Sequence, residues 1–146
     1  AWCATRYSDR FAAGVMFVGI GDKVSKVGTT DIPNEEYHVH ALHRWMADDM
    51  AAIGAHIDAF EYCPDHPDGT VERYRRVNIR RKPGPGMITD LLGRFPVNAD
   101  DSILIGDKPS DLEAARAAGL QGHLFSGGNL EAFVRMHLPR RPASAP

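Results

Sequence analysis

The sequence has few cysteines, little excess charge of either sign and no long apolar run. Two cysteines among 146 residues can form one disulfide at most, and we expect both to be free thiols. A net charge of -2 provides no global attraction to nucleic acid or to anionic membranes, so neither partner is expected. The longest apolar stretch, residues 11–20, is interrupted by Gly14 and Gly19 and is shorter than the roughly 20 residues that cross a bilayer.

The beginning of the chain does not resemble a secretory signal. Arg6, Asp9 and Arg10 precede the apolar stretch, and no small-residue cleavage site follows it. We therefore expect a cytoplasmic protein. A chain of 146 residues is long enough for one domain with one core, and we expect a monomer.

Helix and strand patterns alternate from residue 34 onward. Apolar spacing, caps and breakers predict helices over 35–53, 85–95, 112–118 and 130–137, and strands over 57–62, 102–105 and 122–125. Alternating strands and helices with short connections predict an α/β fold, a three-layer Rossmann-like parallel sheet with helices on both faces.

The ends and faces of the helices follow from individual residues. Asn34, Ser110 or Asp111, and Asn129 are the expected caps, and Gly54 and Gly119 the expected ends. The apolar positions of the first helix predict its buried stripe: Leu42, Trp45, Met46, Met50 and Ile53. Those of the second and last helices are Met87, Leu91, Leu92 and Phe95, and Leu130, Phe133, Val134 and His137.

Three parts of the chain lack this regular pattern. Residues 1–34 form an atypical segment in which 15–20 alone suggests a strand, and residues 139–146 read as a flexible tail. Residues 70–81 hold five arginines and no sustained apolar period, so we expect an exposed loop. The domain core is accordingly residues 35–138.

An acid and a base follow directly after the strand at 102–105. Parallel sheets present ligand-binding groups at this edge, and carboxylates with water and substrate phosphate are the usual ligands of Mg2+. We therefore expect Asp107 to be a metal ligand, with the positive charge of Lys108 beside it. Asp111 can cap the next helix, bind the metal through water, or orient Lys82 or Lys108. The simpler alternatives are a surface acid at Asp107 and a plain helix cap at Asp111.

Arg81 and Lys82 lie before two prolines and two glycines that lead into a helix. A turn at the N-terminus of a helix can bind an anion. Arginine binds phosphate through two nitrogens, and lysine supplies a point charge. The alternative is a solvated basic loop. With Asp107 and Lys108 following one helix later, we favour a phosphate and metal site.

Zinc is not expected. Cys63 and His66 are three residues apart, but a structural zinc site needs four ligands, and residues 77–80 provide neither cysteine nor histidine. The other histidines share no spacing that indicates a metal, so we interpret most of them as surface or edge residues.

Three segments resemble the haloacid dehalogenase (HAD) superfamily of phosphohydrolases, in the branch of the D-glycero-D-manno-heptose 1,7-bisphosphate phosphatases and histidinol phosphatases. They are YCPDHPDG at 62–69, RKPGPGM at 81–87 and GDKPSDLEAA at 106–115, and the helix around 41–46 is also similar. The resemblance covers about residues 35–134. It implies a HAD-like fold and a cytoplasmic, Mg2+-dependent phosphatase in which an aspartate attacks phosphorus and the aspartyl phosphate is hydrolysed.

The resemblance also implies roles for individual residues. Asp107 would bind Mg2+, and Lys82 would neutralise the nucleophile and the phosphate. Arg81 and Lys108 would recognise the phosphate or sugar hydroxyls of a small phosphorylated substrate. In the heptose branch that substrate is a sugar bisphosphate used in ADP-heptose and lipopolysaccharide core synthesis; histidinol phosphate is the alternative.

The sequence departs from the branch at two places. Many members bind structural zinc through Cys-x-His and Cys-x-Cys, whereas this chain has Asp65, Asn78 and Arg80 at three of those positions, which implies a zinc-free variant. The family's Asp-x-Asp-Gly motif, with its nucleophile and general acid, does not occur. Asp22 is the only candidate nucleophile by position, and Thr29-Thr30 weakly echoes the second motif.

These departures leave two hypotheses about the whole chain. It is either a phosphatase by descent, with a truncated or frame-disrupted front half, or a non-catalytic remnant that keeps a phosphate-binding surface as an interaction module. In both cases we expect little or no turnover by these 146 residues.

Overall fold

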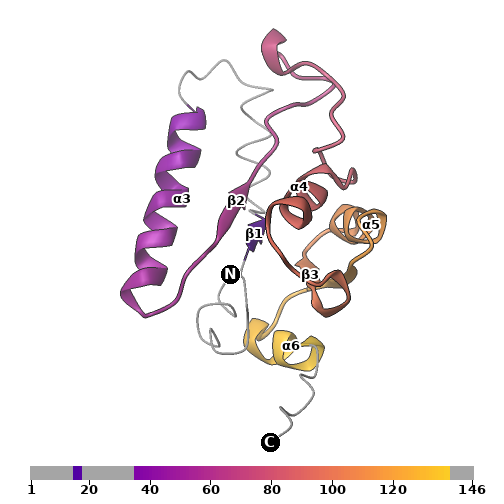
Figure 1. Cartoon of the computed structure of the whole chain (residues 1–146). Coiled ribbons are helices and arrows are strands. Elements are labelled where there is room, and N and C mark those ends of the chain that lie inside the picture. The colour runs from indigo at the N-terminus through magenta and orange to yellow at the C-terminus, as the bar shows by residue number, and fades with distance from the viewer. Residues whose placement is uncertain (1–14, 18–34, 139–146) are drawn as a thin grey trace, which may run out of the picture.

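The computed structural model describes residues 15–17 and 35–138, which form short strands and helices in alternation (Figure 1). The elements are β1 (Val15–Phe17), α3 (Glu35–Ala52), β2 (Ala59–Glu61), the 3-10 turn η2 (Glu72–Tyr74), α4 (Gly86–Arg94), the 3-10 turn η3 (Ala99–Asp101), β3 (Ile103–Gly106), α5 (Pro109–Ala117), β4 (Gln121–Leu124) and α6 (Leu130–His137). Apart from β1, the expectations for residues 1–34 and 139–146 lie outside the described residues, including those for Asp22 and Thr29-Thr30.

The strands pair in parallel, as the alternating pattern predicted. Strand β1 pairs with β2, and Val15 lies opposite Ala59. Strand β3 pairs with β4, and Ile103 lies opposite Gln121. In Figure 1, α3 lies on one side of the β1–β2 pair, and α4 and α5 lie on the other. Parallel strands between two layers of helices confirm the predicted α/β class, although the described strands form two separate pairs and not one continuous sheet.

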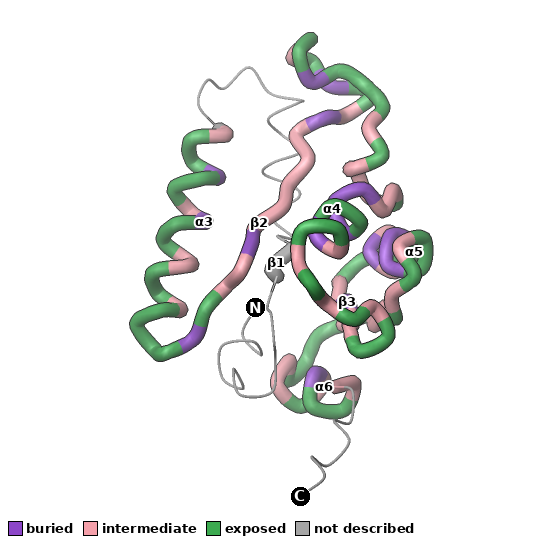
Figure 2. Tube along the Cα trace, in the orientation of Figure 1, coloured by how far each residue is buried: buried purple, intermediate pink, exposed green. Residues whose placement is uncertain are grey.

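The main core lies where α4 and α5 pack on β3. Its buried residues are Ile88 from α4, Leu104 from β3, and Ala114 and Ala115 from α5; Figure 2 shows buried, purple stretches in both α4 and α5. The small alanines let α5 approach the strands closely. At Gly122 an added Cβ would lie 3.1 Å from the Cβ of Ala115. Close packing therefore holds the second turn of α5 against β4.

Helix α3 buries a stripe that overlaps the predicted one in part: Leu42, Met46 and Met50 are half-buried, but the fully buried residues are others. Trp45 and Ile53 are 61% and 66% exposed, whereas Val39 and His43 are buried. The ring of His43 stacks on Phe60 of β2 at 4.4 Å between centroids. The prediction for Trp45 and Ile53 was wrong because apolar periodicity does not distinguish adjacent stripes, while contact with β2 selects one of them.

Most predicted helix ends are confirmed. Gly54 and Gly119 have φ of 77° and 78°, a left-handed conformation that glycine adopts without strain. The side chain of Asn129 accepts a 2.9 Å hydrogen bond from Ala132 N and caps α6. Helix α5, however, begins at Pro109, and its N-cap is Lys108 rather than Ser110 or Asp111. Proline is favoured in the first turn of a helix, so α5 begins earlier in the sequence than predicted.

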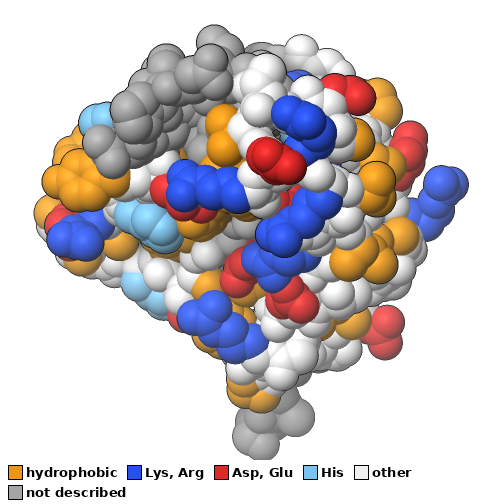
Figure 3. Space-filling model, turned by 90° about the horizontal axis from the view of Figure 1, so that it is seen from above, with side chains coloured by type: hydrophobic (Ala, Val, Ile, Leu, Met, Phe, Trp, Pro, Cys, Tyr) orange, Lys and Arg blue, Asp and Glu red, His pale blue; other side chains and the backbone are white. Residues whose placement is uncertain are grey.

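The loop over residues 70–81 is not wholly exposed, contrary to the prediction. Tyr74 is buried, and the half-buried Arg80 forms ion pairs with Glu61 of β2 and Asp90 of α4. Partners far away in the sequence thus hold a segment that has no apolar period of its own. The face in Figure 3 likewise shows Lys and Arg side chains beside acidic ones.

Candidate functional site

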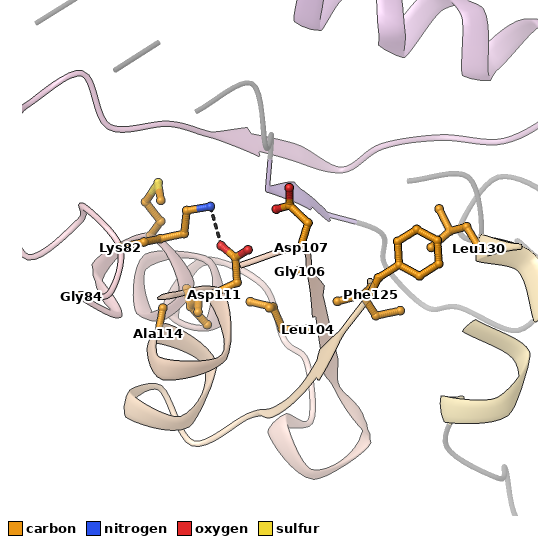
Figure 4. A pocket seen from close by; sticks show the side chains of 12 residues that line it. Lys82, Gly84, Leu104, Gly106, Asp107, Asp111, Ala114, Phe125 and Leu130 are labelled. Atoms are coloured by element: carbon orange, nitrogen blue, oxygen red, sulfur yellow. Dashed lines mark ion pairs between the residues drawn. The ribbon is translucent and has the colours of Figure 1, made fainter. Parts of the chain in front are cut away.

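Lys82, Asp107 and Asp111 come together around one cavity of about 210 Å³. Lys82 precedes α4, Asp107 follows β3, and Asp111 lies in the first turn of α5. Figure 4 shows their side chains together with those of Leu104, Phe125 and Leu130, which belong to the apolar part of the cavity wall. The cavity therefore combines one cation and two carboxylates with an apolar wall.

Asp111 is held by two contacts that leave it little freedom. Its Oδ1 lies 2.5 Å from Lys82 Nζ, and its Oδ2 accepts a 3.0 Å hydrogen bond from Lys108 N. The residue is buried, and the Lys82 side chain is 25% exposed. Of the three roles expected for Asp111, the geometry shows two: it stabilises the start of α5 and orients Lys82.

Gly106 makes the approach of Asp111 possible. A Cβ at position 106 would lie 2.3 Å from the Cβ of Asp111 and 2.5 Å from its Oδ2, far inside contact distance. Only glycine at the end of β3 lets the first turn of α5 come this close. As a result, Asp107 and Asp111 face the same cavity, and Asp107 remains exposed at its rim.

The structure does not place Arg81 and Lys108 on the cavity wall. The Arg81 guanidinium donates from Nη1 to the backbone oxygen of Asp65 at 3.0 Å, and the Lys108 side chain is exposed. The expected site residues therefore divide into a central group of three and two cations outside it.

Sequence reasoning missed the apolar wall and the role of Asp65. Phe125 lies directly after β4, at the strand end where parallel sheets place ligand contacts, and this position could have identified it. Asp65 is 1% exposed, which no local pattern signals, because its partners Arg76 and Asn78 are more than ten residues away.

The donor set suits magnesium better than zinc. Mg2+ is held by one or two carboxylates together with water and phosphate oxygens, and Asp107 and Asp111 provide two carboxylates at the cavity. Within residues 35–138, no group of three or more His, Cys, Asp or Glu side chains is arranged to hold a metal. Cys63 is a free thiol and its burial raises its pKa, so it is protonated at neutral pH.

The histidines of residues 35–138 do not gather at one place but make local contacts with nearby rings and hydroxyls. His40 Nε2 lies 3.0 Å from the Tyr62 hydroxyl, and the rings of His123 and His137 stack at 4.0 Å. Burial, and secondarily the neighbouring His40, lowers the pKa of His43. His43 is an exception to the surface or edge position expected for most histidines, because it packs inside the fold.

Comparison with known proteins agrees with this arrangement. The HAD-hydrolase-like family model matches residues 79–144. A D-glycero-beta-D-manno-heptose-1,7-bisphosphate 7-phosphatase of Rhodopseudomonas palustris is 48% identical over 103 residues, covering 70% of this chain and 57% of the relative. This chain belongs to the HAD-like hydrolases. A D-glycero-alpha-D-manno-heptose-1,7-bisphosphate 7-phosphatase of Burkholderia mallei is 40% identical over 79 residues, covering 54% of this chain and 42% of the relative.

Solved structures share the HAD-like fold. The D,D-heptose 1,7-bisphosphate phosphatase from B. bronchiseptica, complexed with magnesium and phosphate, has a TM-score of 0.51 and 32% identity over 69% of this chain and 53% of that one. A putative HAD-like phosphatase from Mesorhizobium loti has a TM-score of 0.55 and 28% identity over 62% and 44%.

This HAD-like chain spans about half the length of the relatives it matches. Over the residues that the structure describes, no helix is both long and apolar enough to cross a membrane.

Proposed function

We propose that this chain is by descent a Mg2+-dependent phosphohydrolase of sugar bisphosphates, which in its complete form acts on D-glycero-D-manno-heptose 1,7-bisphosphate. The main support is the 2.5 Å ion pair of Lys82 and Asp111 beside Asp107 in one cavity. A fixed ammonium group next to a carboxylate suits a phosphate that must be bound together with a divalent cation. The names of the relatives support the choice of a heptose bisphosphate.

Each residue of the central group has a distinct part in this proposal. Lys82 Nζ donates to a phosphate oxygen while Asp111 holds its position. Asp107, with Asp111 through water, would hold Mg2+, which neutralises phosphate charge and orients the ester when bound. Arg81 and Lys108 approach the substrate from outside the cavity and recognise its second phosphate or its hydroxyls.

The described residues do not provide an evident nucleophile. The carboxylates from residues 35–138 that line the cavity are those of Asp107 and Asp111; the first is assigned to the metal, and the second is paired with Lys82. Covalent hydrolysis through an aspartyl phosphate needs one more carboxylate. Asp22 is the candidate from the sequence. We therefore expect these 146 residues to bind phosphate with Mg2+ and to hydrolyse heptose bisphosphate slowly or not at all.

The second candidate function is a phosphate-binding module without catalysis. The observation that favours it is the same lack of a third carboxylate among the described residues that line the cavity. Two measurements on the 146-residue chain separate the candidates: binding of inorganic phosphate with and without Mg2+ by calorimetry, and phosphate release from heptose bisphosphate and from histidinol phosphate.

Each outcome has a defined meaning. Mg2+-dependent binding that is lost in Lys82→Met supports the site, and its absence in the wild type overturns it. Robust hydrolysis that Asp107→Ala abolishes would refute the expected low turnover, and Asp22→Asn would then test the nucleophile. Preferential hydrolysis of histidinol phosphate would overturn the choice of substrate.

A further inference from the structure

Asp65 is the most deeply buried charged residue of the described chain, and it lies outside the cavity. Its side chain is 1% exposed. Its Oδ2 accepts hydrogen bonds from Arg76 Nε at 2.7 Å and from Asn78 Nδ2 at 2.5 Å. Burying a carboxylate is strongly unfavourable unless charged and polar partners compensate for the lost hydration. A carboxylate held in this way fixes the position of its partners.

Those partners lie six and four residues before Lys82. Asn78 Oδ1 accepts a hydrogen bond from Arg80 N at 2.9 Å, and the Asn78 backbone oxygen accepts one from Arg81 N at 3.0 Å. Asp65 also binds this segment with its own backbone, because its oxygen accepts from Arg81 Nη1 at 3.0 Å. Asn78, Arg80 and Arg81 are thus linked to Asp65 directly or through one residue.

The turn that follows has little room to absorb a displacement. A Cβ at Gly84 would lie 2.1 Å from the backbone oxygen of Ile79, and one at Gly86 would lie 2.9 Å from the Cα of Arg80. Gly84 N donates to Arg81 O at 2.8 Å, and Gly86 N donates to Ile79 O at 3.0 Å. A shift of residues 78–81 therefore moves the backbone of Lys82 as well.

We propose that Asp65 is a positioning residue for phosphate binding: by holding Asn78 and Arg81 it sets the turn from which Lys82 reaches Asp111 and the phosphate. The proposal rests on the proposed function, since it assigns the phosphate to Lys82. It gives the loop after β2 a part in the site, although none of its side chains lines the cavity.

The test compares two equal changes of charge in one loop. Asp65→Asn weakens the acceptor for Arg76 and Asn78, whereas Asp68→Asn alters an exposed aspartate three residues later. Calorimetric titration with inorganic phosphate and Mg2+, well below the melting temperature, should show at least about tenfold weaker binding for Asp65→Asn, as is typical when the orienting partner of a ligand-binding group is lost. Asp68→Asn should bind like the wild type.

A reciprocal exchange separates positioning from stability. The double variant Asp65→Asn/Asn78→Asp again has one carboxylate and one amide in the pair. Its phosphate affinity should therefore be higher than the added effects of the two single changes predict. A merely structural Asp65 would lower the melting temperature and leave the affinity of the folded protein unchanged. Equal affinity of wild type and Asp65→Asn, both folded by circular dichroism, overturns the proposal.

Lys82 itself provides a readout that does not depend on phosphate. Acetylation of Lys82, followed by mass spectrometry, should be faster in Asp65→Asn than in the wild type, because the ammonium group leaves Asp111. Lack of phosphate binding by the wild type would overturn the proposed function and with it the phosphate part of this proposal, whereas faster acetylation in Asp65→Asn would still show that Asp65 positions Lys82. Unchanged acetylation of Lys82 in Asp65→Asn would overturn the positioning role alone.

Discussion

Lys82 Nζ lies 2.5 Å from Asp111 Oδ1, and the second oxygen of the same carboxylate accepts the backbone N–H of Lys108. One buried carboxylate therefore connects the turn before α4 to the first turn of α5. Because Asp107 is next to Lys108 in the chain, the same contact sets the distance between the phosphate-binding cation and the expected metal ligand.

Loss of the ammonium group of Lys82 should destabilise the fold. Lys82→Met leaves the carboxylate of Asp111 buried without its cation, and we expect a loss of about 2 kcal/mol, less than for a fully buried pair because Lys82 is partly exposed. Arg116→Met, an exposed cation on the same helix as Asp111, is the control and should change stability by less than about 0.5 kcal/mol. Urea unfolding measures both, and equal values would contradict the role of the pair.

Alanine should have opposite effects at two glycines. Gly106→Ala puts a Cβ 2.3 Å from the Cβ of Asp111 and should cost about 2 kcal/mol or more by overpacking. Gly93→Ala lies within α4 with nothing within 4 Å of the new Cβ, so it should stabilise by about 0.5 to 1 kcal/mol through helix propensity. Thermal unfolding checks the signs, and a neutral Gly106→Ala would refute the close approach.

Acid should remove the contribution of Asp65 to stability. Burial raises the pKa of this carboxyl, but hydrogen bonds from Arg76 and Asn78 and the charge of Arg76 outweigh burial, so the folded pKa lies below the ordinary value. The contribution is complete above the unfolded pKa of about 3.9 and is lost as the pH falls from there through the folded pKa. We expect urea unfolding between about pH 6 and pH 2.5 to show that the free energy of unfolding falls less with acid in Asp65→Asn than in the wild type. Equal slopes would contradict this.

His43 should add a pH dependence in a milder range. Burial, with a contribution from His40, lowers its pKa below the ordinary 6.5. The neutral ring is therefore favoured in the fold, and its contribution is present above pH 6.5 and lost as the pH falls below that value, because the unfolded chain takes up the proton first. His43→Phe keeps a ring against Phe60 and should reduce the slope of stability between about pH 7 and 5. An unchanged slope would show that other groups dominate.

The orientation of α3 can be tested with one buried and one exposed residue. Val39→Ala removes buried apolar surface and should cost about 2 kcal/mol, including the cavity that is left. Trp45 is 61% exposed, so Trp45→Ala should change stability by only about 0.5 kcal/mol. A larger loss of stability in Trp45→Ala than in Val39→Ala would instead support the buried face that apolar periodicity predicted.

The prediction from the sequence was most accurate where the signal is local. Asn129 caps α6 and Gly54 and Gly119 end their helices because caps and left-handed glycines are properties of a few consecutive residues. The sequence predicts a start of α5 at Leu112, three residues after the observed start at Pro109, because Ser110 and Asp111 are also favourable capping residues. The HAD-like motifs predicted the family, which the comparisons confirm.

The sequence by itself determined the alternation of helices and strands, the parallel class of the sheet, and the expectation that Lys82 and Asp107 belong to one site. Only the tertiary structure decided that Asp111 pairs with Lys82, that Arg81 turns toward Asp65, and that α3 buries Val39 rather than Trp45. Local patterns reflect backbone preferences over a few residues, whereas these three outcomes depend on which distant partner is within reach once the chain has packed.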